Sequence, residues 1–114
     1  MRALILTLTC LSTACALDLP GGVSTDRDDH RLHAVAGAVT VALVNPVSCY
    51  LTRDMEPGYK RYAARVLIDS AAAGLVGVAK EMYDNQGYGT CDKSDAFATL
   101  YGGLGASLVI NVRF

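Results

Sequence analysis

The chain has 114 residues, a net charge of −1, 52% hydrophobic residues and no Trp. Once an N-terminal signal is removed, this length holds one small domain and leaves no room for a second. The sequence has no basic patch, which excludes nucleic-acid binding by charge. Ala, Val, Leu and Gly outnumber large aromatic residues, so we expect a core that packs through close backbone approach.

The N-terminus has the features of an export signal. Met1-Arg2 supplies a positive charge, Ala3–Leu11 is apolar, and Ser12–Ala16 is a run of small residues. This pattern predicts a signal peptide over residues 1–16 that is cleaved after Ala16. Lipidation of Cys15 and an uncleaved anchor are the alternatives. Each of them predicts an exported protein, in the periplasm or associated with the inner or outer membrane.

Residues 17–24 are predicted to form a flexible tether, because they contain Pro20, Gly21 and Gly22. The helical domain is expected to cover residues 25–114. Its first helix begins near Thr25, a good N-cap followed by acidic residues.

That first helix has small side chains at every fourth position, Ala34, Ala38 and Ala42. Such a row lets another helix approach closely. The Asn45-Pro46 pair must end or kink the helix, because proline lacks the backbone donor.

A loop over residues 52–58 and a second helix over residues 59–84 are expected next. Pro57 and Gly58 are typical of a loop. In the helix, Arg65 and Asp69 are four residues apart, which predicts an ion pair at the surface.

The third helix is predicted to start at Asp92 or Ser94, after a Gly-containing loop over residues 85–90, and to continue to Val112. Gly102, Gly103 and Gly105 interrupt it. Three helices joined by short loops most simply run up, down and up. The predicted fold is therefore all-α: a small up-down-up bundle rich in Ala and Gly, preceded by a signal peptide.

Two stretches without charge raise the question of a membrane. Residues 34–51 and 96–112 contain 18 and 17 residues, the lower limit for crossing a bilayer. Gly, Ala, Ser and Thr dilute both stretches. We therefore expect a bundle in the periplasm or on a membrane surface, and membrane embedding of the first and third helices is the alternative.

The up-down-up order brings polar residues from three separate segments to one end of the bundle. The candidate polar cluster consists of Asp29, His33, Lys80, Glu81, Asp84 and Asp95. His33, Glu81, Asp84 and Asp95 are the candidate metal ligands. The competing interpretation is structural: caps, a Lys80–Asp84 pair and solvated helix ends, with Asp29 and His30 exposed.

The same topology places Cys49 and Cys91 at opposite ends of the bundle. A helix of about 25 residues is roughly 37 Å long, far more than a disulfide spans. We therefore expect no disulfide between these two residues within one chain.

One family resemblance covers residues 29–103. The elements Asp29-x-x-x-His33-x-x-x-Gly37, Lys80-Glu81-x-x-Asp84 and Asp92-x-x-Asp95-x-x-Ala98, with Gly102-Gly103, resemble the YfiM-like family of small bacterial and phage lipoproteins. In that pattern a basic residue follows the first Asp and an aromatic residue follows the His, whereas this chain has His30 and Ala34. The resemblance implies an envelope-associated helical protein and supplies no reaction.

Three functions follow from the sequence, which contains no classical catalytic motif and implies no cofactor. The first is a structural or interaction role in the cell envelope, with a membrane surface or an envelope protein as partner. The second is a metal-binding or hydrolytic protein that uses the His/Glu/Asp cluster. The third is a small membrane-embedded module that acts on lipid or on a membrane protein.

Overall fold

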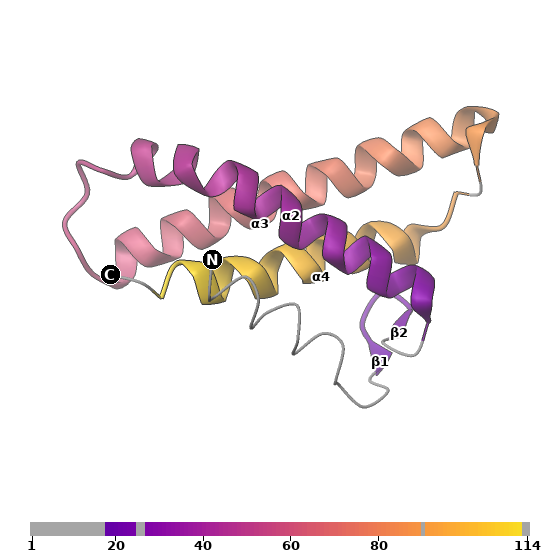
Figure 1. Ribbon diagram of the computed structural model, residues 1–114, viewed down its shortest axis with the longest axis horizontal. Helices are drawn as coiled ribbons and strands as arrows, with labels where there is room; N and C mark the ends of the chain where they lie inside the picture. Colours follow the sequence, from indigo (N-terminus) through magenta and orange to yellow (C-terminus); the bar gives the residue numbers. More distant parts are fainter. Residues whose placement is uncertain (1–17, 25–26, 90, 113–114) are drawn as a thin grey trace.

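The computed structural model describes residues 18–24, 27–89 and 91–112, which form three long helices and a small hairpin (Figure 1). The helices are α2 (Asp28–Leu51), α3 (Tyr59–Tyr83) and α4 (Lys93–Ile110), and a π-helical turn, η1 (Asp84–Tyr88), continues α3. The all-α three-helix bundle predicted from the sequence is confirmed. The signal peptide over residues 1–16 and the lipidation candidate Cys15 lie outside the described residues.

Helix α2 passes through Pro46 and ends only at Leu51. Proline therefore does not end the helix, although it cannot donate a hydrogen bond to the carbonyl of Ala42 one turn earlier. After Leu51 the Thr52 amide and hydroxyl both donate to the carbonyl of Ser48, the hydroxyl at 2.8 Å. These bonds satisfy a carbonyl that the end of the helix would otherwise leave free.

The segment expected to be a loop after the second helix winds for one further turn. Residues Asp84–Tyr88 are π-helical, and the turn stops at Gly87, whose φ of 101° favours glycine. Helix α4 then begins after Asp92, whose side chain accepts a hydrogen bond from the Ser94 amide. Asp92, one of the two start positions predicted for the third helix, is thus the N-cap of α4.

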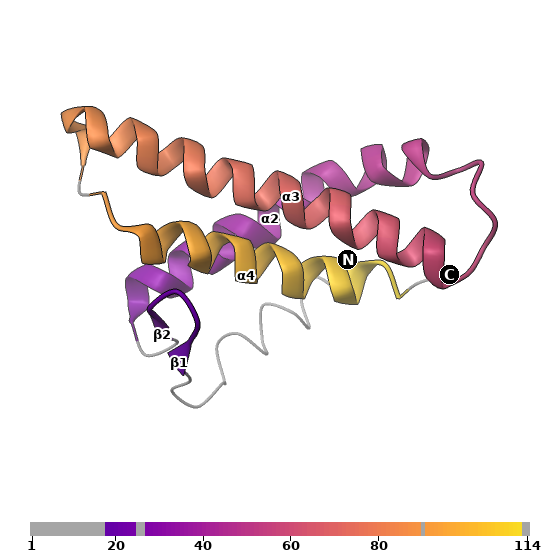
Figure 2. The same ribbon diagram turned by 180° about the vertical axis from the view of Figure 1, so that it is seen from behind.

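The three helices run up, down and up, and α4 packs along both others (Figures 1 and 2). Helices α2 and α4 are parallel: Gly37 lies against Thr99 and Gly103, and Asn45 reaches Asn111 near the far end of both helices. Helix α3 is antiparallel to them, because its early residue Asp69 bonds Asn111 while its late residue Glu81 bonds the backbone before α4.

The bundle core is made of small side chains. Ala38, Val41, Ala73 and Ala106 form the buried cluster, and Ile110 packs against it. Helices α2 and α4 approach so closely that a Cβ on Gly102 would overlap the backbone of Ala34. The three glycines expected to interrupt the third helix leave α4 continuous from Lys93 to Ile110.

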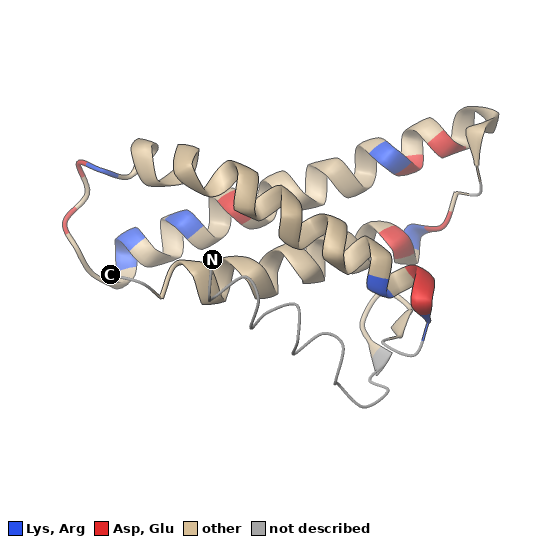
Figure 3. Ribbon diagram, in the orientation of Figure 1, with Lys and Arg blue, Asp and Glu red and all other residues tan. Residues whose placement is uncertain are grey.

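The large hydrophobic side chains consequently face outward. They cover the outer faces of all three helices; those more than 60% exposed are Leu32, Leu43, Tyr50, Leu51, Tyr59, Leu67, Leu75, Met82 and Tyr88. The charged residues gather mainly toward the two ends of the bundle (Figure 3). The interior is thus small and partly polar, whereas the outer surface is apolar.

The segment expected to be a flexible tether contains a two-stranded hairpin. Strands β1 (Asp18–Leu19) and β2 (Val23–Ser24) are antiparallel, joined through Gly21 and Gly22, which both have positive φ. The Tyr101 hydroxyl on α4 donates to the Pro20 carbonyl at 2.9 Å. The hairpin is therefore held against the bundle.

Two glycines on α4 test the close packing. Gly102→Ala should lower the free energy of unfolding by about 1–3 kcal/mol, since its Cβ has no room against the backbone of α2. Gly105→Ala is the matched control: nothing lies within 4 Å of its added Cβ, so it should stabilise the helix by about 0.5–1 kcal/mol. Thermal unfolding followed by circular dichroism measures both. Equal effects of the two substitutions would contradict the packing described here.

Candidate functional site

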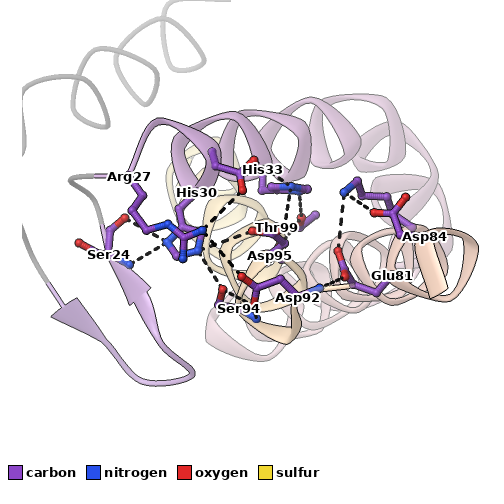
Figure 4. Close-up of polar contacts among 12 residues, drawn as sticks. Ser24, Arg27, His30, His33, Glu81, Asp84, Asp92, Ser94, Asp95 and Thr99 are labelled. Atoms are coloured by element: carbon purple, nitrogen blue, oxygen red, sulfur yellow. Dashed lines mark hydrogen bonds and ion pairs between the residues drawn. The ribbon is translucent and has the colours of Figure 1, made fainter. Parts of the chain in front are cut away.

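The end of the bundle formed by the start of α2, the end of α3 and the start of α4 holds a dense group of polar side chains (Figure 4). We call it the polar end. All six residues of the predicted cluster lie there, in two neighbouring groups. Asp29, His33 and Asp95 form the first group, and Lys80, Glu81 and Asp84 form the second.

The first group is centred on His33. Its Nε2 atom lies 3.7 Å from Asp29 Oδ1 and 3.4 Å from Asp95 Oδ2. Its Nδ1 atom lies 3.5 Å from Thr99 Oγ1. Asp29 is about half exposed, whereas His33 and Asp95 are largely covered, so the group is reached from the Asp29 side.

Asp95 is a buried carboxylate that is poorly hydrogen-bonded. Only 4% of the residue is exposed, and its Oδ1 atom accepts no hydrogen bond from any described residue. Removal from water raises the pKa of Asp95, and the nearby His33 opposes this effect only in part. The buried negative charge is therefore destabilising unless something positive accompanies it.

His30, expected to be exposed, is in fact buried, with 1% of its surface accessible. Its Nδ1 accepts a hydrogen bond from the Ser24 amide at 3.0 Å, and its Nε2 lies 2.9 Å from Ser94 Oγ. The Ser94 hydroxyl donates to Asp92 at 2.6 Å, so its oxygen can accept a hydrogen bond from the Nε2–H of His30. His30 thus joins the hairpin to α4 because both of its nitrogens are used.

The second group ties the end of α3 to α4. Lys80 bonds Asp84 at 2.7 Å, the pair expected from their spacing of four residues, and this bond raises the pKa of Lys80. The buried Glu81 accepts the Asp92 amide at 2.6 Å through Oε2, and its Oε1 lies 3.7 Å from Lys80. These contacts engage Glu81 and Asp84, two of the metal-ligand candidates, away from His33.

A polar cavity of about 360 Å³ lies between the two groups. Its lining consists almost entirely of charged residues: Arg27, Asp29, Lys80, Asp84, Asp92 and Asp95, with Gly89. Four carboxylates and two cations leave a formal charge of −2 on the wall. The cavity therefore favours cations over anions.

A second polar cluster, missed in the sequence, lies deep in the bundle around Asp69. Asp69 is fully buried and does not form the surface pair expected with Arg65, which bonds Thr52 instead. Its Oδ2 accepts hydrogen bonds from Asn45, Ser107 and Asn111, at 2.9, 3.1 and 2.8 Å. The buried residues of α3 are spaced by four: Asp69, Ala73, Gly77 and Glu81. This period in the sequence was the signal for the burial of Asp69.

The two cysteines of the described chain are free. Cys91 is exposed next to the polar end, whereas Cys49 is partly buried at the opposite end of the bundle, where its thiol faces Asn45. The expectation that they form no disulfide within one chain is confirmed.

No family model, curated protein or solved structure matches this chain. The site is therefore interpreted from its own geometry.

The carboxylates of Asp95 and Asp92 should contribute to the free energy of unfolding with opposite signs at neutral pH, measured in metal-chelating buffer. The raised pKa of Asp95 means that the folded state holds this proton more tightly, so its ionisation lowers stability as pH rises through the interval between the ordinary and the raised pKa. Asp95→Asn should therefore increase the free energy of unfolding at neutral pH, and the gain should shrink toward pH 3.

Hydrogen bonds from Ser94 lower the pKa of Asp92. This carboxylate stabilises the fold above its ordinary pKa, and the effect is lost as pH falls through the lowered value. Asp92→Asn should destabilise the chain at neutral pH, with a loss that also shrinks toward acid. Denaturant unfolding between about pH 7 and pH 3 measures both variants. If both variants were less stable than the parent at neutral pH, the cost of burying the Asp95 charge would be smaller than the stabilisation that this charge gains from its neighbours.

Proposed function

We propose that this chain is a membrane-embedded three-helix module whose polar end lies at one membrane surface. The observation that carries the proposal is the inverted distribution of side chains: large hydrophobic residues face outward, while Ala, Gly and hydrogen-bonded polar residues fill the interior. In water, so much exposed apolar surface is unfavourable. In lipid, an apolar exterior and small residues between the helices are favourable.

The lengths of the uncharged stretches suit this placement. Residues 34–52, 66–79 and 96–112 contain no Asp, Glu, Lys or Arg other than Asp69. At 1.5 Å per residue they are about 28, 21 and 25 Å long, somewhat under the roughly 30 Å of a bilayer core. The shortest is flanked by Arg65 and Lys80, whose long side chains can extend to the interface.

Two helices of the described chain, α2 and α3 with η1, are long and apolar enough to cross a membrane. Only 28% and 17% of their apolar windows are buried inside the bundle. The core helix of a water-soluble protein passes such a test by being buried, and these helices are mostly exposed. This exposure favours a lipid environment.

The buried Asp69 fits the same proposal. An ionisable residue within a membrane segment faces the interior of a bundle and pairs with polar groups there. Asp69 does so through three hydrogen bonds from α2 and α4. Its position among small residues explains how a charge-bearing side chain is kept away from lipid.

We propose that the module has an interaction role in a membrane of the cell envelope. The resemblance to the YfiM-like family and the predicted export signal support an envelope location. A cavity of about 620 Å³ between α3 and α4 has a mainly apolar lining that includes Val78, Met82, Phe97 and Leu100. An acyl chain or an apolar helix of a membrane protein is the partner that this surface suits.

A matched pair of substitutions on α2 tests the membrane placement. Leu32 and Leu43 are 70% and 74% exposed, and their separation of eleven residues places them on one face, about 16 Å apart along the axis. Leu43 lies at the middle of the uncharged stretch, whereas Leu32 follows Arg31 at the polar end. In a bilayer, Leu43→Arg should cost about 2.5–3.5 kcal/mol and Leu32→Arg far less.

The measurement is the fraction of the full chain that stays with membranes after an alkaline wash, with Cys15→Ser in both variants and in the parent chain. We expect the parent and Leu32→Arg to stay and Leu43→Arg to be depleted. In a water-soluble bundle both surface substitutions would change stability by less than about 0.5 kcal/mol. Release of the parent by the wash, or equal retention of the two variants, would overturn the proposal.

A further inference from the structure

A neutral His33 has one arrangement of its single proton that suits the groups around it. The Thr99 hydroxyl donates to the Asp95 backbone carbonyl at 3.0 Å, so Thr99 Oγ1 is left to accept a hydrogen bond from His33 Nδ1. A neutral imidazole carries only one proton. With that proton on Nδ1, the Nε2 lone pair points toward the carboxylates of Asp29 and Asp95, at 3.7 and 3.4 Å; Figure 4 shows His33 above Asp95 and Thr99.

A lone pair that faces two carboxylates is repulsive unless a cation lies between them. The three facing atoms, Asp29 Oδ1, His33 Nε2 and Asp95 Oδ2, all lie within 4.8 Å of one another. Ligands bound at about 2.1 Å in tetrahedral geometry lie about 3.4 Å apart. The separations of 3.4 and 3.7 Å from Nε2 match this spacing.

The other groups around these atoms also favour a cation. The adjacent cavity has a wall with a formal charge of −2, and Asp29 and Asp95 form part of that wall. Asp95 is nine-tenths buried, and no described residue donates a hydrogen bond to its Oδ1, which lies 3.6 Å from His30 Nε2 while Oδ2 faces His33. Thr99 holds His33 through the nitrogen that would not bind the ion, the usual arrangement around a metal-bound histidine.

We propose that Asp29, His33 and Asp95 bind one divalent first-row transition metal ion at the polar end, with its open coordination positions toward the charged cavity. One imidazole and two carboxylates suit Zn²⁺ or Mn²⁺ better than Ca²⁺, which takes oxygen ligands only. A second group of possible ligands, His30, Asp92 and Asp95, is less suitable, because Ser24 and Ser94 use both nitrogens of His30. The ion is independent of the membrane placement, so each proposal can fail alone.

The experiment uses the full chain without a histidine tag, in detergent and stripped with a chelator. Zn²⁺, Mn²⁺ and Ca²⁺ are titrated separately, and bound metal is measured by equilibrium dialysis together with the melting temperature. We expect one Zn²⁺ or Mn²⁺ per chain, tighter binding than Ca²⁺, and a melting temperature that rises by several degrees at saturation, since the ion binds the folded state.

His33→Gln removes the nitrogen ligand and should weaken binding at least 100-fold. Asp29→Asn changes a half-exposed ligand, so it should weaken binding without unfolding the chain even if His33→Gln fails to fold. Asp28→Asn is the matched control, because its 93%-exposed side chain lies one residue away and outside the group; it should keep the dissociation constant within about twofold.

Two results would overturn the proposal. The first is a parent chain that binds neither Zn²⁺ nor Mn²⁺, which would leave a doubly protonated His33 paired with two carboxylates. The second is Asp29→Asn binding as tightly as Asp28→Asn, which would place any bound ion elsewhere.

Discussion

The contact between the backbones of α2 and α4 is the constraint on which the rest of this structure depends. Ala34 faces Gly102, and Gly37 faces Thr99 and Gly103, with no space for a further carbon atom. Helices this close cannot enclose Leu, Phe or Tyr, so those residues lie on the outside and the interior is left to small and hydrogen-bonded groups. The same approach brings the start of α2 beside the start of α4, and the polar end is a direct result.

The sequence predicted most of the fold because its signals were local. Pro57-Gly58 and the glycines near residue 88 marked the connections, and Asp92 marked the start of α4. The proline signal was weaker: α2 continues past Pro46 to Leu51 although Pro46 cannot donate a backbone hydrogen bond.

Local sequence patterns did not predict which polar residues are buried. Asp69 was assigned to the surface because Arg65 lies four residues earlier, but its own helix buries the row that continues through Ala73 and Gly77. His30 was expected to be exposed because one of its partners, Ser24, lies in a segment predicted to be a flexible tether, and the other, Ser94, lies 64 residues away in α4. Convergence of Asp29, His33 and Asp95 followed from the up-down-up order, whereas the contact of His33 Nδ1 with Thr99 Oγ1 had no signal in the sequence.

The cluster around Asp69 has a consequence for how such a bundle would meet lipid. One carboxylate oxygen holds groups from α2 and α4, and Glu81 fixes α3 to α4 near the other end. Sliding one helix by a turn, about 5.4 Å, would break these bonds together. The bundle therefore has a fixed hydrophobic thickness: in a bilayer of different thickness it would tilt as a unit or thin the lipid around it, and it would partition toward the membranes that match it best.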